Sequence, residues 1–286
     1  MVELRVRSAQ VVALRLFDLA YEIDLRLAEE IWARRAKSRS SRGRLAGTPP
    51  KAVSFGVPPL ALELEPVALE VGGTPVTATA AVRLYDFGIA ALALWLPVED
   101  MVWSAFTRLV NQTDLTIGPM AATDIWQRLL SELRHLLSEA LHRPTSAPLQ
   151  EDYLIALINA FNTAPSADEL QQGVDLVPLL AGEERPLSEA SRRDLLRQRF
   201  SYYRDDLVVL TWDRAFIYEP RSETDVADVL EMANAQLLEM RTYDEMLDDE
   251  LPRMRQLVEA THRGVNLLSP ADMQGWPAGS ALLSPK

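Results

Sequence analysis

Alternating and continuous runs of apolar residues predict strands in the first part of the chain. The β-branched run VVALRLF (11–17) predicts a strand, followed by a helix that Asp24 can cap. PLALELEPVALEV (59–71) alternates apolar and acidic residues, which is typical of a half-exposed strand, and Pro66 interrupts it. GGTP (72–75) then predicts a turn.

Two more strands and two helices complete the predicted first half. VTATAAVRLYDFG and IAALALWLP, which together cover 76–97, predict two strands, with Pro97 as the end of the second. Apolar residues at helical spacing predict helices over 98–110 and 123–142, and Thr123 can cap the longer one.

The second half repeats this order of elements. EDYLIALINAF (151–161) predicts a buried strand, and Ser166 and Ser188 are candidate caps of two helices. LVVLTWDRAFIYEP (207–220) predicts a buried hairpin, with Asp213 accepting backbone hydrogen bonds in its reversal.

The pattern predicts an α+β protein with two ferredoxin-like halves of the type strand, helix, hairpin, helix. The Pro-rich segment 143–150 is the candidate boundary between residues 1–145 and 150–263. Residues 264–286 predict an irregular tail. A duplication would produce this repeated order of elements, and so would two unrelated α+β halves.

A long helix is predicted over 224–263. Its apolar residues recur at alternating steps of four and three from Val226 to Val258, with Asp244 as the single polar residue of the seam. This heptad pattern is typical of a coiled coil, although an amphipathic helix on its own sheet also fits it. Pro252 predicts a kink or a restart of the helix. The partner-binding residues predicted on this helix are Leu230, Leu237, Met240, Asp244 and Leu247.

Charge is unevenly distributed along the chain of 286 residues, whose net charge is −12. Residues 1–51 carry 11 basic and 6 acidic side chains, a balance of +5, and residues 222–260 carry 11 acidic and 3 basic, a balance of −8. The overall charge disfavours general nucleic-acid binding, and the asymmetry favours an oriented partner or second subunit.

The segment 34–51 carries seven basic residues and no acidic ones among Ser, Gly and Pro, which predicts a solvated loop. It is also a candidate contact for RNA, DNA or anionic lipid. The residues that would bind an anion are Arg34, Arg35, Lys37, Arg39, Arg42 and Arg44.

Few residues suggest catalysis or the binding of a metal or cofactor. The absence of Cys excludes disulfides and thiolate sites, and three His leave little for a metal centre. We therefore expect no cofactor and no catalytic or metal-binding residues. The alternative is a hydrolytic or small-ligand enzyme with a carboxylate and Arg pocket near 202–219, built from Arg204, Asp205, Asp206 and Glu219.

The stretch FSYYRDDLVVLTWDRAFIYEP and the helix after it resemble one family. Small residues from Ala233 to Ala235, then Gln-Leu-Leu-Glu (236–239) and the pair Tyr243 and Asp244, are similar to the uncharacterised family named for "required for meiotic nuclear division protein one" and its bacterial relatives. The resemblance covers about 200–250. No catalytic residues are established for that family, so the resemblance assigns none here. For eukaryotic members it implies mitochondrial membranes and support of mitochondrial translation, often with a C-terminal membrane segment. This chain has no such segment after His262.

These observations favour a non-enzymatic scaffold or assembly protein. Its 226–258 helix would bind a protein partner or a second copy of the chain, and its basic loop would add a charged contact. No uninterrupted apolar stretch predicts a transmembrane segment, so we expect a cytoplasmic protein that reaches membranes only through a partner.

Overall fold

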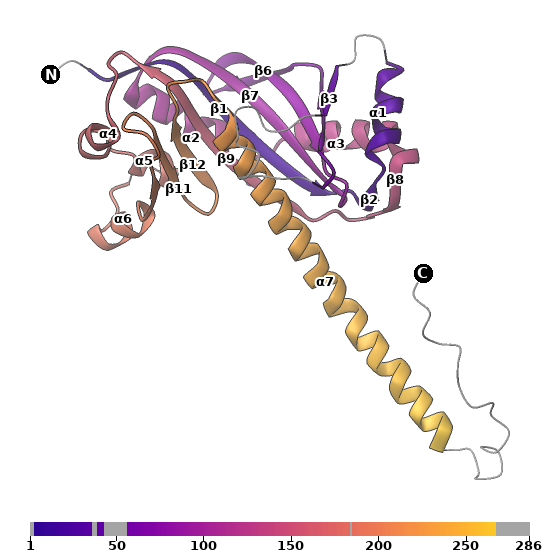
Figure 1. Cartoon of the computed structure of the whole chain (residues 1–286). Coiled ribbons are helices and arrows are strands. Elements are labelled where there is room, and N and C mark those ends of the chain that lie inside the picture. The colour runs from indigo at the N-terminus through magenta and orange to yellow at the C-terminus, as the bar shows by residue number, and fades with distance from the viewer. Residues whose placement is uncertain (1–2, 36–38, 43–55, 184, 267–286) are drawn as a thin grey trace. The chain divides into compact units, whose positions relative to one another are not determined.

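Within the described residues, a mixed sheet of ten strands forms the core of the unit 1–239 (Figure 1). The computed structural model describes residues 3–35, 39–42, 56–183 and 185–266. The sheet has the order β10-β11-β12-β9-β1-β7-β6-β4-β3, and β5 also pairs with β6. Its strands are β1 (Arg5–Asp18), β3 (Ser40–Arg42), β4 (Leu60–Glu63), β5 (Val67–Val71), β6 (Thr74–Leu84), β7 (Ile89–Val102), β9 (Gln150–Phe161), β10 (Gln198–Phe200), β11 (Leu207–Leu210) and β12 (Arg214–Tyr218). All pairs are antiparallel except β12 with β9. A second, two-stranded sheet joins β2 (Ala20–Ile23) and β8 (Leu141–Pro144).

The helices are α1 (Leu25–Ala33), α2 (Trp103–Ile117), α3 (Ile125–Leu136), α4 (Ala167–Gly173), α5 (Val177–Ala181), α6 (Glu189–Leu195) and α7 (Asp225–Asn266). Three of the four predicted caps are confirmed, whereas α3 has Asp124 rather than Thr123 at its cap position and the Asp124 side chain makes no capping hydrogen bond. Asp24 accepts a hydrogen bond from the Leu27 backbone N–H at 2.9 Å, and Ser166 and Ser188 accept one at the starts of α4 and α6. Each cap satisfies a backbone donor that the first helical turn leaves unpaired.

The sheet is built outward from β1, which lies between β7 and β9. Residues 5–18 pair with β7 from Arg5↔Val102 to Asp18↔Ile89, and β9 pairs along the other edge. One sheet therefore contains strands from both sides of the expected boundary at 143–150, and residues 1–239 form one compact unit. The strand order gives no evidence of two ferredoxin-like halves.

Both faces of the sheet are covered. One face packs against α1 to α5, through side chains such as Trp32, Phe106 and Leu170. The other face packs against the first turns of α7, where Ala227, Ala235 and Leu238 are buried. The alternation of side chains along each strand supplies both cores.

Three local predictions were wrong. Residues 98–102 continue β7, and Pro97 lies within that strand opposite Gln10, because the long pairing with β1 outweighs local preference. The helix expected over 123–142 ends at Leu136, and its last residues begin β8. In the β11–β12 turn, Thr211 rather than Asp213 accepts the backbone N–H of Arg214, at 3.0 Å.

Residues 240–286 form a second unit, of which the structure describes the helical part up to 266. Helix α7 runs through Pro252 without interruption, so the restart predicted there does not occur. None of the helices in the described ranges combines the length and apolar character that a membrane span requires.

Candidate functional site

Within the first unit, helix α7 packs on the sheet mainly through residues outside its heptad row. Of the heptad residues, Val226 and the predicted partner-binding residue Leu230 are partly buried against the core of the sheet. The buried positions include Ala227, Glu231, Ala235 and Leu238, whereas Leu237 is 57% exposed. Writing the heptad with Leu230 at position a puts the buried residues at e, b and f, outside the a and d seam. The fully buried residues therefore lie on a different side of the helix from the predicted stripe, which meets the sheet only at its start.

A buried charge network explains this choice of side. Arg83 on β6 donates to Asp228 at 2.8 Å and lies 3.0 Å from the carboxylate of Glu231. The hydroxyl of Tyr85 donates to Glu231 at 3.1 Å. Burial raises the pKa of Glu231, which the Arg83 charge opposes. Removing one member would leave a buried charge without its partner, so the network fixes which face of α7 meets the sheet.

Within the second unit, the seam residues of α7 remain exposed. Met240, Leu247, Leu251, Met254 and Val258 occupy a and d positions and are between 50% and 68% exposed. Asp244 is the polar member of this row. We call residues 240–258 at a and d positions the α7 seam.

The remaining positions of this stretch are mostly polar. Glu245, Asp249 and Gln256 lie at b and f, away from the seam, and Pro252 also lies at b. An isolated helix with one apolar stripe and one polar face is marginal in water, because helical stability comes mainly from packing that stripe.

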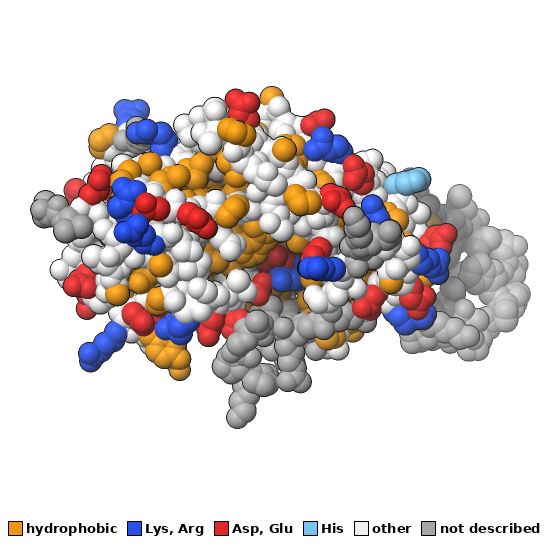
Figure 2. Space-filling model, turned by 90° about the horizontal axis from the view of Figure 1, so that it is seen from above, with side chains coloured by type: hydrophobic (Ala, Val, Ile, Leu, Met, Phe, Trp, Pro, Cys, Tyr) orange, Lys and Arg blue, Asp and Glu red, His pale blue; other side chains and the backbone are white. Residues whose placement is uncertain are grey.

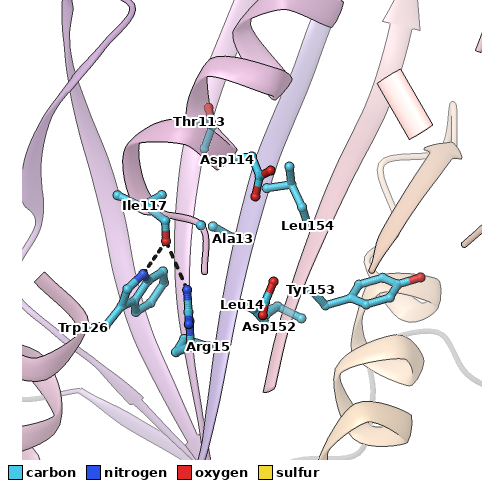
Figure 3. Close-up of a pocket in the computed structure, with 11 residues that line it drawn as sticks. Ala13, Leu14, Arg15, Thr113, Asp114, Ile117, Trp126, Asp152, Tyr153 and Leu154 are labelled. Atoms are coloured by element: carbon cyan, nitrogen blue, oxygen red, sulfur yellow. Dashed lines mark hydrogen bonds between the residues drawn. The ribbon is translucent and has the colours of Figure 1, made fainter. Parts of the chain in front are cut away.

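A second candidate is a small polar pocket between α2, α3 and the sheet (Figure 3). Arg15 on β1 and Asp152 on β9 are direct cross-strand neighbours, yet no ion pair joins them in the described part of the chain. Arg15 turns instead to the Ile117 carbonyl, 3.4 Å away, which also accepts the indole N–H of Trp126. Asp114 and Asp152 lie on the other side of the pocket.

The electrostatics of this pocket are unusual for a protein interior. Arg15 is 5% exposed, and its Nε has no hydrogen-bond partner within the described residues. Burial lowers the pKa of Arg15, and the charges of Asp152 and Asp114 oppose that change. Burial likewise raises the pKa of Asp152. The cavity volume is only about 10 Å³, room for about one water molecule, so a substrate does not fit.

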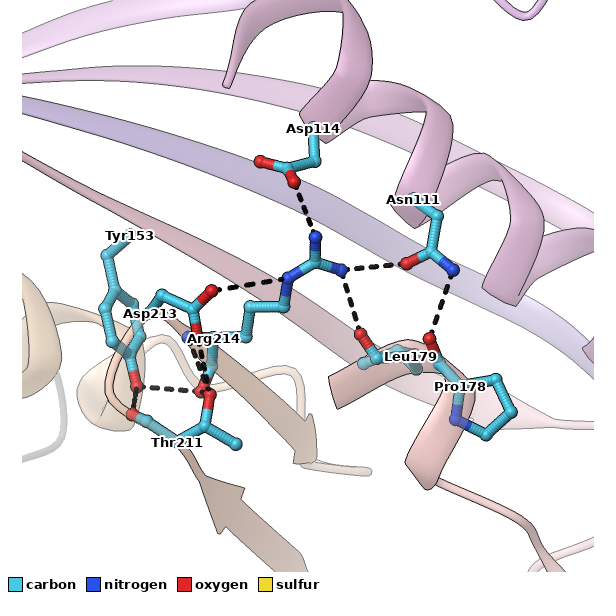
Figure 4. A network of polar contacts seen from close by, with 8 residues as sticks. All are labelled: Asn111, Asp114, Tyr153, Pro178, Leu179, Thr211, Asp213 and Arg214. Atoms are coloured by element: carbon cyan, nitrogen blue, oxygen red, sulfur yellow. Dashed lines mark hydrogen bonds and ion pairs between the residues drawn. The ribbon is translucent and has the colours of Figure 1, made fainter. Parts of the chain in front are cut away.

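Arg214 forms a neighbouring network that connects three segments (Figure 4). Its guanidinium donates to Asp114 at 2.6 Å, to Asn111 at 2.8 Å and to the Leu179 carbonyl at 3.0 Å. Asp213 lies 3.8 Å away. These contacts leave the side chain well satisfied, so we interpret Arg214 as a connector of β12 with α2 and α5.

The carboxylates predicted near 202–219 do come together, but around a residue that the sequence did not suggest. Arg221 lies 2.7 Å from Glu219, 3.3 Å from Asp206 and 3.4 Å from Asp205. Arg204 is exposed and is not part of this cluster.

Asp206, which directly precedes the β11–β12 hairpin, is buried. It accepts the backbone N–H groups of Tyr202 and Tyr203 at 2.7 and 3.0 Å. The sequence holds no signal for this arrangement, because every residue except Pro carries a backbone N–H that an Asp could accept.

The basic segment is only partly described. Lys37 and Arg44 lie outside the described residues, as does the side chain of Arg42. Residues 40–42 form strand β3, so this part is not a loop. Arg34, Arg35 and Arg39 are exposed, and Arg39 lies 3.8 Å from Glu63. Figure 2 shows a face where basic and acidic side chains are intermixed around hydrophobic ones.

In the described ranges, no group of three or more His, Asp or Glu side chains is arranged to hold a metal ion. Neither a curated protein nor a solved structure gives a significant match to the chain. The resemblance over 200–250 to the "required for meiotic nuclear division protein one" family gains no support from named relatives and stays a prediction.

One family model matches residues 8–225, well over half of the chain and almost the whole of the sheet unit. Its description is "Uncharacterized protein MJ0711, N-terminal domain". The chain therefore belongs to the family of the N-terminal domain of uncharacterized protein MJ0711.

Proposed function

We propose that this protein is an assembly protein that pairs with a second copy of itself through the α7 seam. The observation that carries the proposal is the exposure of five apolar heptad residues, from Met240 to Val258, on one stripe of a long helix. Burial of such a stripe against an identical helix is the driving force of a coiled coil.

Charged residues beside the seam favour a parallel pair. In a parallel coiled coil, a g residue of one helix meets the e residue five positions later on the other. Glu250 is at g and Arg255 is at e. An antiparallel pair would bring g beside g and e beside e. The acidic residues Glu245, Asp249 and Glu259 lie at outer positions, where solvent screens their repulsion.

Glu250 and Arg255 each form an ion pair within their own chain, but these pairs do not prevent pairing between the two chains. Glu250 pairs with Arg253 at 2.8 Å and Arg255 with Glu259 at 3.1 Å, both on an exposed helix surface. Exposed pairs of this kind contribute little to stability, so their partners can be exchanged at small cost.

Fewer observations support the two alternatives, an enzyme with a pocket near 202–219 and a protein that binds anions through its basic segment. Asp206 and Glu219 both pair with Arg221, which weakens the case for a catalytic pocket near 202–219. Arg39 has Glu63 as a counterion, which weakens the case for an anion site at the basic segment.

Light scattering on a sizing column tests the proposal, because a monomer has a mass of 32.0 kDa and a dimer twice that. We expect a dimer. Glu250→Arg and Arg255→Glu should each weaken it, and the double variant should restore it, because the ion pair is then reformed with its charges exchanged. A monomer at every concentration would refute the proposal, and weakening without restoration would refute the parallel arrangement.

A further inference from the structure

An open groove lies at the β10 end of the main sheet. Its volume is about 480 Å³, within the usual range of binding sites, and α6, β10 and the β11–β12 hairpin line it. Leu195, Phe200, Leu210 and Trp212 form its apolar part. Trp212 is 86% exposed, which is unusual for so large an apolar side chain and typical of a contact surface.

Strand β10 offers a free edge beside this groove. It is the last strand of the sheet order, and within the described residues no strand pairs with its outer side. Its three residues are all exposed. The backbone N–H and C=O groups of such an edge can pair with an added strand.

The two faces of β10 differ in chemistry. Gln198 and Phe200 pair with Leu210 and Val208 on the groove face. Arg199 points to the opposite face, where it donates to Gln171 at 3.2 Å. An added strand would therefore place alternate side chains beside Phe200 and beside Arg199, so an alternation of apolar and acidic residues fits both faces.

The charge of residues 192–199 also indicates which kind of partner binds at β10. Residues 192–199 carry four Arg and one Asp, in a chain whose net charge is −12. A second copy of the chain fits poorly, because a symmetric pairing of two β10 edges would place Arg199 opposite Arg199.

We propose that β10 and the adjoining groove bind an extended peptide of alternating apolar and acidic residues as an added strand. The exposed side chains of Arg193 and Arg197 add attraction for acidic residues at the end of the groove. This surface is separate from the α7 seam and does not depend on self-association.

The probe is a fluorescein-labelled Val-Glu-Phe-Glu-Val-Glu peptide, with Val-Lys-Phe-Lys-Val-Lys as its counterpart, titrated with the full chain and followed by anisotropy. We expect saturable binding of the acidic peptide only. Arg199→Glu should weaken it about tenfold and should allow the lysine peptide to bind. Trp212→Ala should weaken binding of the acidic peptide by a similar factor. Arg128→Glu and Tyr21→Ala, which change an exposed Arg on α3 and an exposed aromatic residue on β2, should have no effect.

Four results would overturn the proposal. These are no saturable binding of the acidic peptide up to about 1 mM, equal binding of both peptides, and equal losses in the test and control variants. The fourth is that a single-stranded oligouridine binds, that Trp212→Ala and Arg199→Glu abolish this binding, and that the peptide does not bind. This result would assign the surface to nucleic acid. Circular dichroism of each variant confirms that the fold is retained.

Discussion

Replacing Leu251 by Ala tests the α7 seam most directly. This side chain is 57% exposed at an a position of the single chain. Complete burial of a Leu contributes about 2 kcal/mol, so burying the part now exposed corresponds to roughly 1 kcal/mol per chain. Both chains of a dimer lose it, and the sum of roughly 2 kcal/mol is about a 30-fold increase in the dimer Kd.

Sedimentation equilibrium over a range of protein concentrations measures this Kd. Gln256→Ala is the matched control, because it also places Ala on the same helix but at an f position outside the seam. We expect the control to keep the wild-type Kd. Equal values of Kd for Leu251→Ala and the wild type would show that the seam does not form the contact, and the reasoning from exposure would fail.

Three further predictions concern charge and backbone geometry. Asp244→Asn removes like charges that would face each other in the seam and should tighten the dimer roughly tenfold by sedimentation; an unchanged Kd would argue against an in-register seam. Because burial raises the pKa of Asp152 above 3.8, its ionised form destabilises the fold at neutral pH. Asp152→Asn should therefore resist urea better than the wild type near pH 7, and the difference should shrink as the pH falls through the raised pKa; a less stable variant at neutral pH would contradict this. Gly88→Ala should cost more than about 2 kcal/mol, since its φ is +96° and a Cβ would lie 1.8 Å from the Ala20 carbonyl oxygen. Gly73→Ala, with φ +78° but open space around it, should cost less, and similar urea midpoints for the two variants would refute the steric argument.

Elements that depend on neighbours in sequence were predictable. The caps at Asp24, Ser166 and Ser188 each need only a side-chain oxygen next to the first helical turn. The hairpin at 207–218 needs only two apolar runs and a short polar break. These signals are local, so the sequence carries them in full.

Features that depend on strand register were not predictable. Arg15 and Asp152 are 137 positions apart and become neighbours only because β1 and β9 pair. The role of Arg221 as a shared counterion likewise depends on how the hairpin folds back on residues 205 and 206. No periodicity within a short window contains this information.

The side of α7 that faces the sheet could not be predicted from the heptad pattern. The heptad spacing correctly marks one apolar stripe, but the sheet buries the side that carries Asp228 and Glu231. Those acids are acceptable there because β6 presents Arg83, which no inspection of the helix sequence could reveal.

The central position of β1 has a consequence for synthesis on the ribosome. When residues 1–145 have emerged, β1 can pair with β7, but its other edge lacks β9. A 14-residue strand then has one open edge, which can pair with other nascent chains. We therefore expect a fragment that stops at residue 145 to aggregate rather than fold, even though the chain before it reads as a complete α+β half.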